Sequence, residues 1–360
     1  MDDRFGAARD VLTQALHHLA FPCAVIEIGT STTPIWSEAF GHLTFSPGAP
    51  AATTATVFDL ASLTKVLSTT TLVMRAVEQG VLDLDDPISR HFTEWQGVDR
   101  QHVTIRDLLS HASGLPAHRP YYLRLRQDDG GRREQTVDRE AVIRAICAEP
   151  LEYSPRSTTV YSDLGFMLLG FILDGGPGLV ARFDALKNEI APADDLQFRP
   201  PAVWVRRTAP TEVDWWRSRL LRGDVHDENT FALGGAAGQA GLFGTASAIG
   251  SVARHLLQVL DGRIGAFRQE TVRMFTTRRS DVPGSRALGW DTMLPTSSCG
   301  SRMSPLAFGH TGFTGTSLWI DRERAMYAVL LTNRVHPTRS NLAIQHVRRA
   351  FHDATISALD

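Results

Sequence analysis

A serine and a lysine separated by two residues stand early in the chain, in the run Phe58-Asp59-Leu60-Ala61-Ser62-Leu63-Thr64-Lys65. The run predicts the start of a helix that continues to about Gln79 and ends at Gly80. Residues three apart share one face of a helix, so the Ser62 hydroxyl can lie beside the Lys65 amine, as a nucleophile and its base must. The unpaired N–H groups of a first helical turn also favour a developing negative charge. By itself, however, the pattern also describes a helix cap followed by an exposed lysine.

Two further short motifs carry groups that can act with this pair. Tyr161-Ser162-Asp163 follows a loop and opens an apolar helix, and a tyrosine near a lysine can relay protons. His310-Thr311-Gly312 is followed by a second glycine, Gly315, and glycines so close together in a strand mark the approach of another backbone or of a ligand. Taken singly, the first motif describes a buried aromatic side chain with a helix cap, and the second a strand kink with a structural histidine.

In this order, the three motifs resemble the serine β-lactamase and penicillin-binding protein superfamily. The tyrosine that opens the second motif points to the class C branch, which also holds family VIII carboxylesterases, D-aminopeptidases and DD-carboxypeptidases. The runs 104–115 and 223–238 resemble the same branch, and the likeness extends from about residue 20 to about residue 350.

The resemblance implies a role for each motif. Ser62 would be the acylated nucleophile, and the backbone N–H groups of Ser62 and Phe313 would form the oxyanion hole. Lys65 and Tyr161 would take the proton of the serine and later activate water. A free lysine costs about 4.6 kcal/mol to hold neutral at pH 7, and a free tyrosine nearly as much to ionise, so we assign the base role to the pair.

Substrate contacts are predicted from the motifs and from two further positions. The motifs supply Asp163, His310, Thr311 and Gly312. Tyr121 and its neighbour Tyr122 are candidates for an acyl pocket, with exposure or core packing as the alternative. Asn333 follows the last predicted strand and is a candidate for reaching a substrate carboxylate. No cofactor and no metal are expected.

Two positions depart from the superfamily pattern. Asp163 stands where β-lactamases usually have asparagine, so a carboxylate replaces an amide donor. His310 stands where lysine is usual, so the charge at that position is conditional near pH 7. Both changes favour an esterase or a D-amino-acid amidase or peptidase over a potent β-lactamase.

We therefore predict a serine hydrolase that cleaves small esters or amides through a covalent acyl-serine. The alternative is a DD-carboxypeptidase, D-aminopeptidase or class C-type β-lactamase that acts on cell-wall peptides or β-lactams. A binding protein without activity on the same scaffold is the remaining hypothesis.

Elements at both ends of the chain are predicted to position the motifs. Apolar spacing predicts a helix over 5–19, a hairpin of strands over 23–28 and 35–40, strands over 307–312, 317–320 and 326–331, and a last helix over 341–356. Residues between them are predicted to form helices over 103–110, 138–148, 161–172, 246–260 and 268–275, with a polar loop over 116–136. The fold class is therefore α+β: an antiparallel sheet domain built from 1–60 and 284–360, flanked by helices, and a mostly helical inserted domain over 61–283.

Composition restricts the partners. The 360 residues are 43% hydrophobic and 21% charged with a formal net charge of −2, which gives no reason to expect binding to nucleic acid or to an anionic membrane. No run reaches the ~18 apolar residues of a membrane span. The three cysteines lack metal-type spacing, and the charged N-terminus is not a secretory signal, so we expect a cytoplasmic protein, with an exported form left open. Monomer and homo-oligomer both remain possible.

Two histidine sites are predicted to be structural. His111 is expected to pack beside the active site. His226-Asp227-Glu228 fits no helix-borne zinc motif and is expected to anchor a loop through hydrogen bonds.

Overall fold

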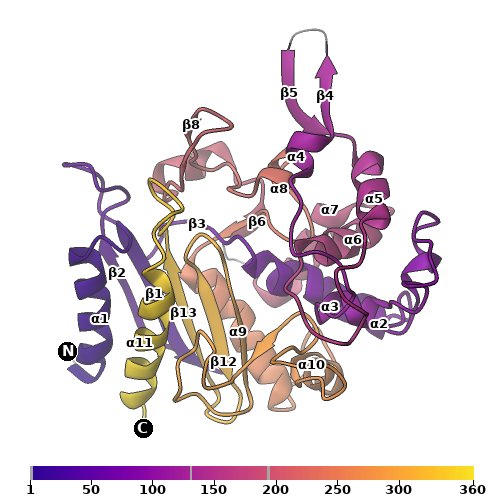
Figure 1. Cartoon of the computed structure of the whole chain (residues 1–360). Coiled ribbons are helices and arrows are strands. Elements are labelled where there is room, and N and C mark those ends of the chain that lie inside the picture. Colours follow the sequence, from indigo (N-terminus) through magenta and orange to yellow (C-terminus); the bar gives the residue numbers. More distant parts are fainter. Residues whose placement is uncertain (1–2, 130–131, 193–194) are drawn as a thin grey trace.

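The computed structural model describes residues 3–129, 132–192 and 195–360. Its centre is a six-stranded antiparallel sheet in the order β10-β11-β12-β13-β1-β2 (Figure 1). These strands are β1 (Cys23–Thr30), β2 (Pro34–Gly41), β10 (Asp291–Thr292), β11 (Ala307–Thr311), β12 (Ser317–Asp321) and β13 (Met326–Thr332). The two ends of the chain meet where β1 pairs with β13, with Ala24 opposite Thr332. The predicted antiparallel sheet built from both termini is confirmed.

Helices cover both faces of this sheet (Figure 1). α1 (Gly6–His17) and α11 (Ile344–Ser357) pack together on one face, and α9 (Ala246–Leu260) packs against β1 and β13 on the other. Side chains alternate along β1, so that Ile26 and Ile28 enter the core with α1 and α11, whereas Val25 enters the larger core on the opposite side. A strand buried on both faces explains why this run is apolar at nearly every position.

Short helices make up much of the middle of the chain, as predicted. They are α2 (Thr71–Glu78), α3 (Ile105–Leu109), α4 (Tyr121–Arg124), α5 (Arg139–Ala148), α6 (Asp163–Leu173), α7 (Leu179–Ile190), α8 (Glu228–Ala232) and α10 (Gln269–Thr276), with 3₁₀ turns at Ile88–Arg90 and Ala202–Arg207. A further 3₁₀ turn, Asp3–Phe5, precedes α1. Small strands accompany them: β3 (Phe58–Asp59), β6 (Leu196–Phe198) and β9 (Leu242–Gly244) form one sheet, and β7 (Val213–Asp214) pairs with β8 (Arg219–Leu220). The helices expected near 103–110, 138–148, 161–172, 246–260 and 268–275 are all present.

The predicted loop over 116–136 is wrong. It contains α4 and a hairpin of β4 (Arg126–Asp129) and β5 (Arg132–Val137), which extends away from the rest of the molecule (Figure 1). The two strands pair through hydrogen bonds between backbone groups, which any side chain allows. Because their sequence is polar, it lacks the alternation of apolar and polar residues that predicts a strand. The tip, 130–131, lies outside the described residues.

The boundaries of the two predicted domains stay a prediction. α9 belongs to the segment 61–283 by sequence yet packs on the sheet built from the termini, because its apolar face covers β1 and β13. Within the described ranges, none of the helices is both long and apolar enough to cross a membrane.

Candidate active site

Ser62 stands at a sharp change of direction between β3 and the following helix. Ala61 has a left-handed backbone (φ 47°), and its N–H donates to the buried carboxylate of Asp59 at 2.8 Å. The predicted single helix is instead a π-helical run, Lys65–Thr70, followed by α2. The expected side-by-side arrangement is nevertheless present, because Lys65 Nζ lies 3.1 Å from Ser62 Oγ. π-Helical turns are found frequently at functional sites.

Lys65 is fully buried, and its ammonium group has three acceptors. It donates to Ser62 Oγ, to Asp163 Oδ1 at 2.7 Å and to the carbonyl oxygen of Gln239 at 3.1 Å. Burial acts to lower the Lys65 pKa, but Asp163 and Tyr161 outweigh it and raise the pKa above its ordinary value. Lys65 is therefore an ammonium ion at neutral pH, which uses all three of its protons as donors.

Tyr161 lies against Lys65, with its ring centroid 4.9 Å from Nζ. The neighbouring Ser162 caps α6 by accepting from the Gly165 N–H, which fixes the backbone at this point. The Tyr161 hydroxyl is buried, and none of the described residues gives it a hydrogen bond of good geometry. Burial raises its pKa, whereas Lys65 and Ser62 act to lower it. The phenol is therefore neutral and adjacent to both groups.

Asp163 contacts the lysine directly, which the sequence did not indicate. Oδ1 binds Lys65, and Oδ2 lies 3.5 Å from Nδ1 of His118. Burial acts to raise the Asp163 pKa, but Lys65 and His118 lower it to about 2. The bond to Asp163 also raises the pKa of His118. Sequence reasoning missed His118 because it lies in the polar run read as a loop, with no motif to mark it.

His310 is neutral in the structure. Its Nδ1 lies 2.8 Å from the Thr311 carbonyl oxygen, which can only accept, so Nδ1 carries the proton. Burial, Lys65 and Arg286 lower the His310 pKa to about 3. The charge that the sequence left conditional is therefore absent at pH 7.

The turn after β11 packs tightly against the residues that precede Ser62. A Cβ on Gly312 would lie 2.5 Å from the Leu60 carbonyl oxygen, so only glycine fits there. The hydroxyls of Thr314 and Thr316 donate to the carbonyl oxygens of Asp59 and Leu60. In the described part of the chain, neither the Phe313 N–H nor the Ser62 N–H has an acceptor.

A cavity of about 600 Å³ opens over these groups. Of the predicted site residues, those that line it are Ser62, Tyr161, Asp163, His310, Thr311, Gly312 and Phe313. Arg286 also lines it, and its guanidinium carbon lies 5.5 Å from the centroid of the Tyr161 ring. Among the described residues it has no carboxylate partner and its side chain makes no hydrogen bond. Sequence analysis missed Arg286, which belongs to none of the three motifs.

Tyr121 and Asn333 are not in the cavity wall. Tyr121 is 1% exposed, as is Asn333, so neither can reach a substrate in this arrangement. The Tyr121 hydroxyl donates to Glu149. Tyr121 and Tyr122 are both buried, so the alternative that they are exposed is wrong. Asn333 donates to the carbonyl oxygens of Leu43 and Pro210 and joins loops instead of binding a ligand.

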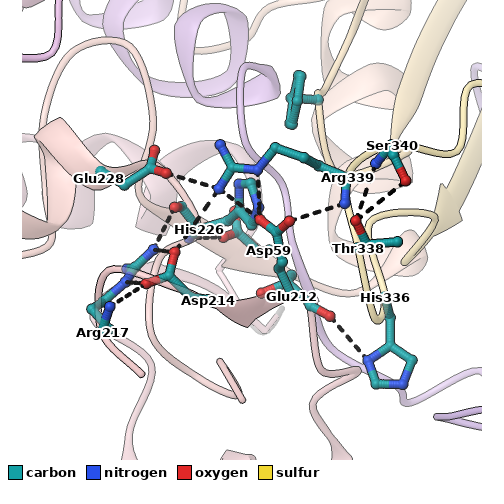
Figure 2. Close-up of polar contacts among 12 residues, drawn as sticks. Asp59, Glu212, Asp214, Arg217, His226, Glu228, His336, Thr338, Arg339 and Ser340 are labelled. Atoms are coloured by element: carbon teal, nitrogen blue, oxygen red, sulfur yellow. Dashed lines mark hydrogen bonds and ion pairs between the residues drawn. The ribbon is translucent and has the colours of Figure 1, made fainter. Parts of the chain in front are cut away.

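Beside the cavity, a polar cluster connects His226, Glu212, Glu228 and Arg339 (Figure 2). Glu212 accepts from Arg339 at 2.6 Å and lies 2.9 Å from His226 Nε2, and the His226 N–H donates to Asp59. The His226 ring also stacks on Phe313. The prediction of a loop-anchoring cluster is confirmed. The expectation for His111 is confirmed too, since its ring packs on Tyr161 and its Nδ1 accepts from the Ser162 N–H.

Comparison with known proteins decides the family. A model of the Beta-lactamase family matches residues 8–351. The chain belongs to the beta-lactamase family. Among curated relatives of this beta-lactamase-family protein, the "Putative D-alanyl-D-alanine carboxypeptidase" of Escherichia coli (strain K12) is 33% identical over 323 residues, which are 79% of this chain and 70% of the relative.

Solved structures extend the likeness over the whole fold. EstCE1, a hydrolase with promiscuous acyltransferase activity, has a TM-score of 0.76 at 21% identity, with 99% of both chains covered. A class C beta lactamase from Rhodobacter sphaeroides has a TM-score of 0.71 at 17% identity, with 98% of both chains covered. The expected β-lactamase/transpeptidase-like fold is confirmed, and this beta-lactamase-family protein is a serine hydrolase.

Proposed function

We propose that the protein is a carboxypeptidase-type serine hydrolase. Its substrates would be acylated peptides or amides whose leaving group is a D-amino acid with a free carboxylate. The relative named "Putative D-alanyl-D-alanine carboxypeptidase" supports this alternative over the small-ester hydrolase favoured from the sequence. A cytoplasmic location and the oligomeric state stay predictions.

Arg286 is the observation that carries the proposal. Among the described residues this guanidinium has no carboxylate partner, and it faces the cavity that holds the nucleophile. A guanidinium can bind a carboxylate through two parallel hydrogen bonds. Because His310 is neutral, the third motif provides no cation for this purpose. Arg286 would supply it from a neighbouring loop, so the absence of lysine at position 310 does not argue against an anionic substrate.

In the proposed reaction, the group formed by Lys65 and Tyr161 first loses one proton to solvent. Ser62 Oγ then attacks the scissile carbonyl carbon, and the serine proton passes to that group. Asp163 holds the Lys65 ammonium in place, so these three residues titrate as a unit and no single pKa describes the base. The free N–H groups of Ser62 and Phe313 would bind the oxyanion. The leaving amine takes the proton, and water attacks the acyl-serine in the second half of the reaction.

The second candidate is an esterase that acts on uncharged acyl groups. Phe313 is 50% exposed at the cavity, and Leu342 and Ile344 line the same wall, which suits an apolar acyl chain. Both candidate functions use Ser62 as the nucleophile. They differ in whether Arg286 binds a carboxylate of the substrate.

A substrate panel with variants of two residues tests the proposal. Acetyl-Lys(acetyl)-D-Ala-D-Ala, the same peptide with a C-terminal amide, its L-Ala-L-Ala isomer and p-nitrophenyl butyrate are compared in wild type, Ser62→Ala, Arg286→Met and Arg286→Lys. We expect Ser62→Ala to abolish every activity. We expect Arg286→Met to lower kcat/KM for the free-carboxylate D-peptide about 100-fold, to leave the ester within threefold, and Arg286→Lys to recover part of the loss.

Two results contradict the proposal. If the amide-capped peptide is cleaved as fast as the free acid, the enzyme does not recognise the carboxylate. If only esters are cleaved and Arg286→Met has no effect on any substrate, the esterase is the correct reading.

A further inference from the structure

Arg348, on the C-terminal helix α11, reaches across to the turn between β11 and β12. Its Nη2 donates to the carbonyl oxygen of Gly312 at 2.7 Å and to that of Thr316 at 2.9 Å. The Gly312 N–H donates to the same Thr316 oxygen at 2.7 Å. One nitrogen of the guanidinium therefore closes a ring of hydrogen bonds across the turn that carries Phe313.

The charge of Arg348 is buried without a counter-ion. Its exposed fraction is 8%, and in the described ranges no carboxylate lies within ion-pair distance of it. Burial and the neighbouring Arg334 lower its pKa to about 9, which still leaves it charged at pH 7. A buried cation that is balanced only by carbonyl groups costs stability. Natural proteins accept local costs of this kind at functional sites.

The carbonyl group that Arg348 binds belongs to the same peptide unit as the Phe313 N–H. When a carbonyl oxygen accepts a charge-assisted hydrogen bond, the peptide becomes more polarised and its N–H becomes a stronger donor. The Gly312 oxygen also accepts from the Gly315 N–H at 3.1 Å, so this N–H and Arg348 together fix the plane of the Gly312–Phe313 peptide, and therefore the direction of the Phe313 N–H. This N–H has no acceptor in the described structure, so both effects are available to a bound group.

We propose that Arg348 is a positioning residue for the oxyanion hole, which orients and polarises the Gly312–Phe313 peptide toward the developing oxyanion. The inference rests on the proposed role of the Phe313 N–H. It predicts a contribution that is independent of whether the substrate carries a carboxylate. In this it differs from Arg286, whose effect depends on the substrate's charge.

Direct binding of substrate is the competing explanation. Arg348 lines the cavity, and its Nε is buried without a partner among the described residues, so it could meet a substrate carboxylate. A neutral ester separates the two explanations, because an oxyanion forms on every substrate and a carboxylate does not.

The experiment compares Arg348→Met, Arg348→Gln and Arg349→Met with wild type. Arg349 is a matched control, because it is the next residue of α11 and donates to two carbonyl oxygens, those of Ser297 and Pro295, away from the cavity. The measurements are kcat and KM for p-nitrophenyl butyrate and the inhibition constant of butylboronic acid. Ser62 Oγ adds to the boron of this inhibitor to give a tetrahedral anion, and the proton of the serine passes to the base.

We expect Arg348→Met to lower kcat and kcat/KM for the ester by about tenfold each, with KM within twofold. This is less than the roughly 10²–10³ lost when an oxyanion donor is removed outright. The inhibition constant of butylboronic acid should rise by the same factor of about ten. Arg348→Gln should lose less, since its amide can still donate to one carbonyl, and Arg349→Met should stay within twofold of wild type.

Three results would overturn the inference: an unchanged kcat in Arg348→Met, an equal loss in Arg349→Met, or an effect limited to KM of the carboxylate-bearing peptide. If circular dichroism shows that Arg348→Met is unfolded, Arg348→Gln decides by the same criteria. Failure of the proposed function looks different, since wild type would then cleave only esters, or would cleave the amide-capped peptide as fast as the free acid, whatever stands at position 348.

Discussion

Replacing Asp163 by asparagine removes the negative charge that holds Lys65, while an amide oxygen remains to accept its hydrogen bond. The Asp163 pKa falls from an ordinary 3.8 to about 2 in the folded protein. At about 1.36 kcal/mol per pKa unit, this corresponds to about 2 kcal/mol of stability. Because the folded-state pKa is the lower one, the stabilisation is complete above about pH 4 and is lost as the pH falls through about 2.

We therefore expect Asp163→Asn to be about 2 kcal/mol less stable than wild type at pH 7. The difference should close as the pH approaches 2. Urea unfolding followed by tryptophan fluorescence at pH 7 and pH 3 measures it. Asp138→Asn is the control, because Asp138 caps α5 through the N–H groups of Glu140 and Ala141 and has no contact with Lys65.

The same substitution should also alter catalysis. Without the carboxylate the Lys65 pKa falls, and an opposite charge at hydrogen-bond distance typically accounts for about 1–3 pKa units. The acid limb of kcat/KM against pH for p-nitrophenyl butyrate should move to lower pH by a similar amount. A variant as stable as wild type at pH 7, or an acid limb that stays in place or moves up, would refute the reasoning about this ion pair.

Two further substitutions test the packing around the site. Gly312→Ala places a Cβ 2.1 Å from Thr316 Oγ1, so the turn must shift, and we expect kcat to fall at least tenfold. Gly175→Ala is the control, because its Cβ would meet nothing closer than 3.8 Å. Full activity of Gly312→Ala would contradict the close packing. Asn333→Ala leaves the buried carbonyl oxygens of Leu43 and Pro210 without a donor, so thermal or urea unfolding should show a loss of about 2–3 kcal/mol with kcat/KM unchanged. A higher KM for the carboxylate-bearing peptide without loss of stability would instead favour the substrate role expected from the sequence.

Local sequence was sufficient for much of the fold. The apolar runs of β1 and β13 and the helical spacing of α9 are determined by neighbours a few residues away, and each element is present where expected. The hairpin of β4 and β5 could not be found in this way, because polar strands that pair mainly through their backbones leave no periodic signal.

Part of the candidate site could also be predicted from local sequence. Ser62 and Lys65 are three residues apart across the turn that leads into the π-helical run, so their contact follows from short-range spacing. The short motifs around Tyr161 and Gly312 were recognisable only together with Ser62 and Lys65, because their order along the chain resembles one superfamily.

Only the tertiary structure decided the charges of the site. Asp163 binds Lys65 across 98 positions of sequence, and burial with nearby cations keeps His310 neutral. Arg286 and Arg348 reach the site from segments without a motif, which no spacing rule connects to Ser62. The physical reason is that pKa values and ion pairs depend on burial and on groups distant in the chain, whereas sequence patterns report the order of neighbours.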